Sequence, residues 1–268
     1  MDELLRIENL TAGYHGKPII EDIDLTVRSG AVMAVVGESG SGKSTLLRAI
    51  LQLKGMRPDM YGGRVRFDGR DMALLSDEER RRLAGQSVSM LFQQAEASLN
   101  PSRTIRAQLY EFVASHVSMT KRDIDARAAE IFGRLHLHDA ERIMRSYPFE
   151  LSGGMAQRTA MMMAVFLRPK LLLADEPTSA LDATVQKQVV EELLMLRRIY
   201  DMSIVIVTHN IGVAKRMADE IVVMRGGRIV ECGAAEAVLT APKAAYTKAL
   251  LAAVPSLDLH SGGEEMRS

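Results

Sequence analysis

Residues 31–44 read AVMAVVGESGSGKS, six apolar residues that lead into a glycine-rich turn. From Gly37 to Ser44 the turn matches the spacing G-x-x-x-x-G-K-[ST] at every fixed position. The following residues, 44–53, place their apolar side chains at helical spacing. A strand, a glycine-rich loop and a helix in this order predict a phosphate-binding loop, because backbone amides and the helix N-terminus attract phosphate oxygens.

The side chains of this loop have separate expected tasks. Lys43 would place its ammonium group on the β- and γ-phosphates of a nucleotide, and Ser44 would offer its hydroxyl to Mg2+. The residues expected around the phosphates are Gly37, Glu38, Ser39, Gly40, Ser41, Gly42, Lys43, Ser44 and Thr45. The loop therefore predicts nucleotide binding with Mg2+, although the motif alone does not say what the nucleotide is used for.

A second element of the site is an acidic pair at the end of a hydrophobic run. Residues 171–174 are apolar, and Asp175 and Glu176 follow them before Pro177. Asp175 would stand at the end of a strand that lies across the sheet from Ser44, where its carboxylate can reach the same Mg2+. Glu176 is then placed to orient or deprotonate an attacking water. The pair predicts nucleotide hydrolysis, with Asp175 as a metal ligand and Glu176 as a catalytic residue.

The rest of the chain predicts an α/β fold with a helical insertion. β-type runs alternate with helical runs, such as a predicted helix at 213–220, on both sides of a stretch that has only helical periodicity. We expect a nucleotide-binding core of residues 1–94 and 160–233, with a mostly parallel sheet and N-terminal antiparallel strands. Residues 95–159 would form a helical subdomain, and 234–268 a short C-terminal extension with a mobile tail.

Composition excludes several classes of protein. The 268 residues contain 34 Lys+Arg and 34 Asp+Glu, so the chain has no basic surplus for binding nucleic acid or anionic membranes. The single cysteine, Cys232, excludes an internal disulfide framework. The acidic start does not resemble a secretory signal. No run approaches the roughly 20 apolar residues of a membrane-spanning helix, so we expect any membrane role to depend on partner subunits.

Residues 151–158, LSGGMAQR, resemble the signature sequence of ABC-transporter ATPase subunits. Met155 departs from the glutamine that many members carry there. The other marks of the family follow in the expected order; they are Tyr14, Gln93, residues 179–182 and His209. Together with the phosphate loop and the acidic strand, these elements imply an ATPase with a RecA-like core, and ATP as its nucleotide.

The resemblance implies a role for each of these residues. Tyr14 would stack on adenine, unless it is only a surface tyrosine. Gln93 would contact Mg2+ or the attacking water, with Gln94 as the alternative if the register differs by one. His209 would contact the γ-phosphate as a catalytic residue, and Asp182 would act across a dimer interface.

The signature itself implies a second subunit. Ser152, Gly153 and Gly154 begin a helix with small residues, which allows the backbone to approach a γ-phosphate. In the family, two ATPase subunits pair head to tail, and each ATP lies between one phosphate loop and the opposite signature. The partner ATPase would be an identical or a sister chain, a choice that the sequence leaves open.

Four further segments resemble the peptide and nickel importer branch of the family; they are residues 91–101, 146–158, 208–231 and 241–255. This resemblance implies two transmembrane permease subunits, an extracytoplasmic solute-binding protein, and a peripheral location on the cytoplasmic face of the membrane. The cargo would be a peptide, or nickel or another metal complex. The alternative is a soluble ABC-type ATPase that acts on nucleic acid or ribosomes. Such proteins usually carry a coiled-coil insertion or two ATPase units in one chain, and neither is visible here, so no nucleic-acid partner is expected.

Overall fold

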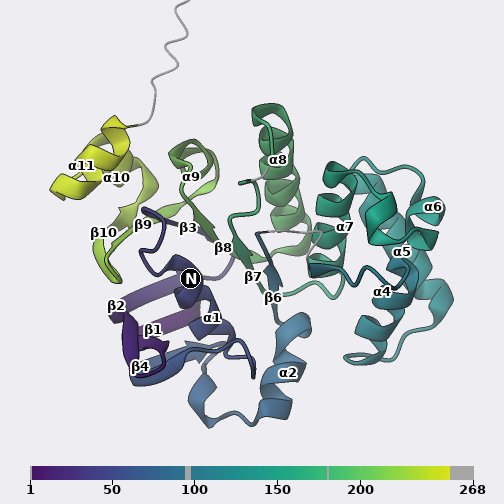
Figure 1. Cartoon of the computed structure of the whole chain (residues 1–268), viewed down its shortest axis with the longest axis horizontal. Coiled ribbons are helices and arrows are strands. Elements are labelled where there is room, and N and C mark those ends of the chain that lie inside the picture. The colour runs from purple at the N-terminus through teal and green to yellow at the C-terminus, as the bar shows by residue number, and fades with distance from the viewer. Residues whose placement is uncertain (1, 94–97, 180, 254–268) are drawn as a thin grey trace, which may run out of the picture.

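The computed structural model describes residues 2–93, 98–179 and 181–253. Within them the chain forms two sheets, with most helices gathered beside the larger one (Figure 1). Gln94, the alternative to Gln93, lies outside the described residues. The same holds for Ala180 in the segment 179–182, and for the predicted mobile tail, residues 257–268.

The larger sheet has six strands in the order β10-β9-β3-β8-β7-β6. The strands are β3 (Val32–Val36), β6 (Val88–Leu91), β7 (Leu171–Asp175), β8 (Ser203–Thr208), β9 (Glu220–Arg225) and β10 (Arg228–Ala234). All pairs are parallel except β9 with β10. Every residue of β3, β7 and β8 is buried, because these strands are covered on both faces. Strands covered in this way have nearly continuous apolar sequences.

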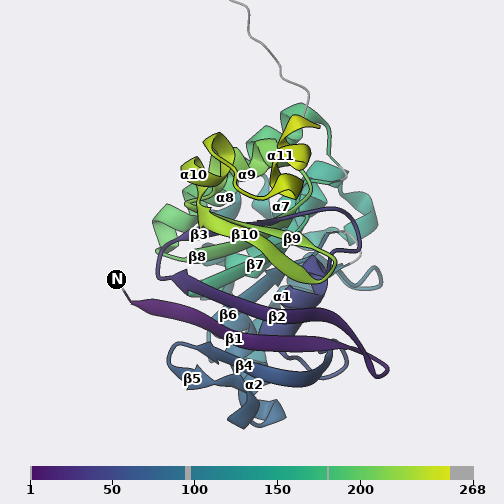
Figure 2. The ribbon, with the colours of Figure 1, turned by 90° about the vertical axis from the view of Figure 1, so that its left-hand side faces the viewer.

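The smaller sheet is antiparallel and has the order β2-β1-β4-β5. Its strands are β1 (Glu3–Tyr14), β2 (Lys17–Arg28), β4 (Asp59–Phe67) and β5 (Arg70–Asp71). Alternate residues of β2 are buried at Ile23, Leu25 and Val27, as expected for a strand with one covered face. Helix α1 (Lys43–Leu51), which follows the glycine-rich loop, shares one hydrophobic core with both sheets and lies between them (Figure 2).

The remaining helices cover the other face of the larger sheet and its ends. They are α2 (Asp77–Gln86), α4 (Ile105–Ala114), α5 (Lys121–Arg134), α6 (Ala140–Arg145), α7 (Gly153–Val165), α8 (Ala183–Tyr200), α9 (Ile211–Met217), α10 (Ala235–Thr240) and α11 (Ala245–Ala252), with short 3-10 turns at Met72–Leu74 and Pro148–Glu150. Helices α4 to α7 gather at one end of the molecule, and α10 and α11 lie at the opposite end (Figure 1). Among the described helices, none has both the length and the apolar character needed to cross a membrane.

The predicted fold class is confirmed, with two local differences. Helix α7 runs without interruption across the predicted subdomain boundary at 159/160. Helix α9 ends at Met217, three residues before the end of the predicted helix. Asp219 lies beyond the helix because it is bonded to the first residue of β3: its N–H donates to the Val32 carbonyl at 2.8 Å, and its carboxylate accepts from the Val32 N–H at 2.8 Å.

Candidate functional site

The glycine-rich loop connects β3 to α1, and close approaches within the chain require two of its glycines, Gly37 and Gly42. A Cβ on Gly37 would lie 2.2 Å from the carbonyl oxygen of Met224. Gly42 has φ +97°, and a Cβ there would lie 2.6 Å from Cγ2 of Ile20. The loop is therefore folded tightly against β2 and β9, with its backbone in conformations that favour glycine.

Lys43 is buried at the start of α1 and is held by backbone oxygens. Its Nζ donates to the carbonyls of Gly37 at 2.9 Å and Glu38 at 2.8 Å. Burial lowers the pKa of this amine, and the nearby carboxylates of Glu176 and Asp175 oppose that shift. Within the described residues, no carboxylate forms an ion pair with Lys43. Its charge is therefore available to an anion that enters the loop.

Ser44 and Asp175 meet as predicted from opposite elements. The Ser44 hydroxyl, in the first turn of α1, donates to Oδ1 of Asp175 at the end of β7 over 2.9 Å. Burial raises the pKa of Asp175, and the bond from Ser44 works against that rise. A hydroxyl and a carboxylate side by side are hard oxygen donors of the kind that Mg2+ takes together with nucleotide phosphates. The residues therefore fit Mg2+.

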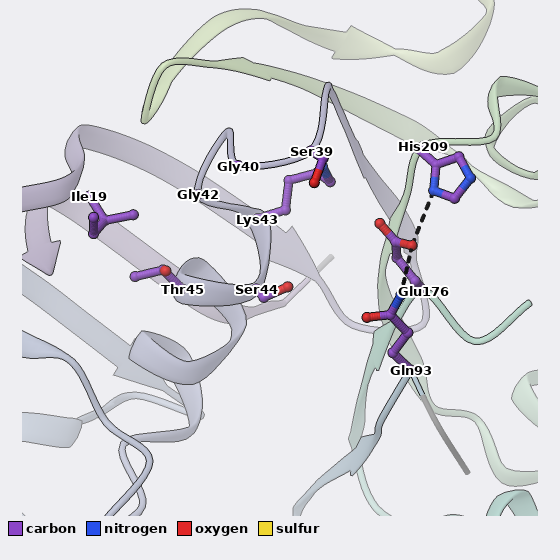
Figure 3. A pocket seen from close by; sticks show the side chains of 10 residues that line it. All are labelled: Ile19, Ser39, Gly40, Gly42, Lys43, Ser44, Thr45, Gln93, Glu176 and His209. Carbon is purple, nitrogen blue, oxygen red and sulfur yellow. Dashed lines mark hydrogen bonds and ion pairs between the residues drawn. The ribbon is translucent and has the colours of Figure 1, made fainter. Parts of the chain in front are cut away.

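Glu176 lies between two other predicted site residues. Its Oε2 is 3.1 Å from Nδ1 of His209 and accepts a 3.4 Å hydrogen bond from Nε2 of Gln93 (Figure 3). Its backbone has φ +46°, which is uncommon for a residue with a side chain. The N–H of Glu176 donates to the Val207 carbonyl at 2.9 Å. Sheet pairing thus holds a strained backbone in place, and strain of this kind is typical of functional sites.

These residues surround one cavity of about 620 Å³. Its lining residues are Ile19, Ser39, Gly40, Gly42, Lys43, Ser44, Thr45, Gln93, Glu176 and His209 (Figure 3). The structure therefore brings together the predicted loop, the predicted base and two residues assigned by resemblance. Ile19 was not predicted, because in the sequence it is only one more apolar residue of a strand.

The other predicted site residues lie outside this lining. Tyr14 ends β1 opposite Lys17, and its hydroxyl is buried without a hydrogen-bond partner among the described residues. Ser152 precedes α7, which begins at Gly153, in the helical part of the chain. Asp182 caps α8, accepting hydrogen bonds of 3.0 Å from two backbone N–H groups. The described cavity therefore contains the phosphate loop without the signature.

Side-chain amides of α7 and α8, that of Gln157 buried and that of Gln186 half-buried, connect these helices to the segment that follows Glu176. Gln157 of α7 donates to the Pro177 carbonyl at 2.8 Å, one residue after Glu176. Gln186 of α8 donates to the hydroxyl of Thr178 at 3.1 Å and accepts from Asn210 at 3.0 Å. Asn210 follows His209 directly. Sequence reasoning missed this network, since glutamines on helices give no spacing signal of their own.

Comparisons with known proteins agree with this geometry. A family model described as "ABC transporter" matches residues 20–179. The metal-staphylopine import system ATP-binding protein CntD of Staphylococcus aureus (strain Mu50) is 36% identical over 96% of this chain and 95% of its own. The dipeptide transport ATP-binding protein DppD of Escherichia coli (strain K12) is 39% identical over 94% of this chain and 78% of its own.

The solved structures extend the likeness to the fold. A dimeric post-hydrolysis structure of the ATP-binding cassette MJ0796, bound to ADP and Pi, superposes with a TM-score of 0.76 at 26% identity. The superposition covers 87% of this chain and 99% of that one. The family predicted from the signature is thereby confirmed. The chain belongs to the ABC transporter family and is an ATP-binding, ATP-hydrolysing subunit of the importer branch to which these relatives belong.

Proposed function

We propose that this chain hydrolyses ATP at the interface of two ABC ATPase subunits and thereby drives a small solute through two permease subunits. The observation that supports the proposal most is the meeting of Lys43, Ser44, Gln93, Glu176 and His209 at one cavity. The signature residues, which the family uses to complete the site, lie outside that cavity.

In the proposed site, the loop and its lysine bind the phosphates. Backbone amides of the loop and the N-terminus of α1 would face the phosphate oxygens. Nζ of Lys43 would keep its two carbonyl partners and direct its remaining N–H to the β- and γ-phosphates. Ser44, Asp175 and Gln93 would hold Mg2+, which neutralises phosphate charge when bound. Tyr14 is proposed to stack on the adenine ring.

Hydrolysis would use the Glu176 carboxylate as the base. A water attacks the γ-phosphorus and gives its proton to Glu176 as the bond to the bridging oxygen of ADP breaks. Gln93 and His209 contact the same carboxylate, so both are placed to set its orientation toward the water. His209 is proposed to contact the γ-phosphate as well.

The second subunit would supply the signature. Ser152, Gly153 and Gly154 begin α7 and would approach the γ-phosphate bound by the opposite phosphate loop. Asp182, at the N-terminus of α8, would act across the same interface. The dimeric form of the solved cassette MJ0796 supports this arrangement. ATP would hold the two subunits together, and hydrolysis would release them.

The cargo class follows from the relatives. Their names specify a metal-staphylopine import system and dipeptide transport. We therefore propose import of a peptide, or of nickel or another metal complexed by a small organic ligand, with a solute-binding protein that delivers it. This subunit would lie on the cytoplasmic face of the membrane, bound to the permeases.

The substitution Glu176→Gln tests the chemical step. We expect ATP turnover to fall by about 100- to 10,000-fold, the usual contribution of a positioned base, while ATP still binds and a dimer accumulates. Phosphate release and size-exclusion chromatography with ATP measure the two effects. The matched control is Glu191→Gln, the same change in an exposed ion pair on α8, which should leave turnover unchanged. Full activity of the Glu176→Gln protein would refute the assignment of the base.

Isolation of the complex tests the transport role. A tag on this chain should recover two hydrophobic permeases and an ATPase partner from detergent-solubilised membranes. The associated binding protein can then be titrated with dipeptides and with nickel complexes to choose between the cargo classes. Recovery of ribosomes or nucleic acid in place of permeases would contradict the importer proposal and leave the ATP chemistry unaffected.

A further inference from the structure

The C-terminal helix contacts the phosphate loop from behind. Tyr246, in the first turn of α11, lies beside Glu38 although 208 positions separate them in the chain. The N–H of Glu38 donates to the Tyr246 hydroxyl at 3.1 Å. The guanidinium of Arg225 lies over the tyrosine ring, 4.9 Å from its centroid. A ring held by a cation therefore presents its oxygen to the loop.

The contact falls on the peptide group that also holds Lys43. The Gly37–Glu38 peptide presents its carbonyl to Nζ of Lys43 at 2.9 Å and its N–H to Tyr246 at 3.1 Å. Because a peptide group is planar, its carbonyl and N–H turn together. A partner on the N–H side therefore fixes the direction in which the carbonyl points, and with it the resting position of the lysine.

The helix that carries Tyr246 is itself anchored. Glu231 of β10 accepts hydrogen bonds from the N–H groups of Lys243 at 2.8 Å and Ala244 at 3.0 Å, directly before α11. The hydrogen bond from the Lys243 N–H is the main cause of a lowered pKa of Glu231, and the bond from Ala244 acts in the same direction. The carboxylate therefore remains an acceptor at neutral pH. The contact from Tyr246 is therefore made by a fixed helix.

The neighbouring hairpin of β9 and β10 supports the loop at two other points. The Met224 carbonyl leaves no room for a side chain at Gly37, and the N–H of Gly227 donates to the Ser41 carbonyl at 3.1 Å. With Tyr246 at Glu38, the C-terminal part of the chain contacts the first, second and fifth residues of the loop. Its contacts are with backbone atoms, and the front of the loop stays open to the cavity.

We propose that Tyr246 is a positioning residue of the nucleotide site, which fixes the Gly37–Glu38 peptide and through it Lys43. The inference rests on the proposed role of Lys43 in binding nucleotide phosphates. Tyr246 does not lie among the residues that line the cavity, so it contributes to the affinity for ATP and not to the chemical step.

The substitution Tyr246→Phe isolates the contact, because it keeps the ring, its packing and the contact with Arg225. We expect the Kd for Mg-ATP, measured by calorimetry on the full chain, to rise about two- to tenfold, the effect of one hydrogen bond. In steady-state hydrolysis, KM should rise by a similar factor and kcat should stay unchanged. Thermal unfolding should also stay unchanged, since the freed N–H of Glu38 lies where water can reach it.

The matched control is Tyr110→Phe. Tyr110 also uses its hydroxyl in a hydrogen bond, to Asp125 at 2.9 Å, but within the helical part of the chain. The same loss of one oxygen there should leave the affinity for ATP unchanged.

The outcomes separate this inference from the proposal on which it rests. If Lys43→Ala loses ATP binding and Tyr246→Phe binds ATP with the native Kd, the positioning role is refuted and the phosphate site stands. If Lys43→Ala keeps native affinity, the phosphate site itself is refuted. A lower Tm of Tyr246→Phe that accounts for its weaker binding would assign the hydroxyl to folding and would also overturn the inference.

Discussion

Two helices of this protein have glycines at or before their first turn, and we propose that both starts approach phosphate, yet their surroundings differ. At the start of α1, Gly37 and Gly42 are pressed against Met224 and Ile20, so the fold of the chain itself demands them. At the start of α7, a Cβ on Gly154 would meet nothing closer than a guanidinium nitrogen of Arg158 at 3.9 Å. The first site is built by its own chain, whereas the second leaves space that its own chain does not use.

The body of α7, by contrast, is anchored to its neighbours in the chain. Nε of Arg158 donates to the Glu192 carboxylate of α8 at 2.8 Å, and the two side chains are only 17% and 4% exposed. The preceding residue, Gln157, donates to the Pro177 carbonyl at 2.8 Å. An anchored helix with an open first turn is suited to present that turn to another molecule. The comparison teaches that the same residue type can serve the fold in one place and, as we propose here, an interface in another.

The largest expected effect comes from removing the anchor of α7. Arg158→Met leaves the Glu192 carboxylate buried without its partner, and we expect the free energy of unfolding to fall by about 3–5 kcal/mol. Burial raises the pKa of Glu192. A protonated Glu192 carries no charge to be buried, so the loss should be smaller near about pH 5 than near about pH 7.5. Urea unfolding at both pH values measures it.

The control for the anchor is Arg158→Lys, which keeps the positive charge but not the two-nitrogen geometry and should lose less stability. An equal loss at both pH values would contradict the electrostatic explanation. A stable Arg158→Met protein would show that α7 is held by its other contacts.

A smaller effect is expected at the phosphate loop. Gly37→Ala forces a methyl group against the Met224 carbonyl, and we expect the free energy of unfolding to fall by about 1–3 kcal/mol. ATP binding should be lost with it, because the Lys43 partner carbonyl belongs to this residue. Denaturant unfolding and nucleotide titration give the two readings. The control is Gly133→Ala in α5, where a Cβ would have nothing within 4 Å and both readings should stay native. Native ATP binding by Gly37→Ala would contradict the conclusion that the fold of the loop requires glycine at this position.

The smallest effect on stability is expected at the signature. Gly154→Ala meets no close atom and replaces glycine inside a helix, so the subunit should gain about 0.5–1 kcal/mol. ATP binding by the single subunit should be unchanged, while ATP-dependent dimerisation and turnover fall by at least about tenfold, as expected when a well-packed contact is lost. Analytical ultracentrifugation with ATP separates these readings. Native dimerisation by the variant would show that the open first turn of α7 does not face a partner.

The sequence allowed the phosphate loop and the acidic pair to be predicted because each is contiguous. The meeting of Ser44 and Asp175 also followed, since Asp175 ends one apolar strand and Ser44 follows the loop at the end of another. The contact of Tyr246 with Glu38 did not, because it depends on β9 pairing with β3 and on the path of the chain beyond β10. Ile19 was missed for a related reason: only the close packing of β2 on the loop places it at the cavity.

The left-handed backbone of Glu176 has a consequence for evolution in the laboratory. We expect a Glu176→Gly protein to be more resistant to heat than the native one, because the relief of backbone strain, about 1–3 kcal/mol, exceeds the chain entropy that glycine costs, about 0.5–1 kcal/mol. A selection for thermal resistance alone would therefore favour loss of the carboxylate that we propose as the base. Stability and turnover compete at this one position, and only a selection that requires cargo uptake would keep the acid.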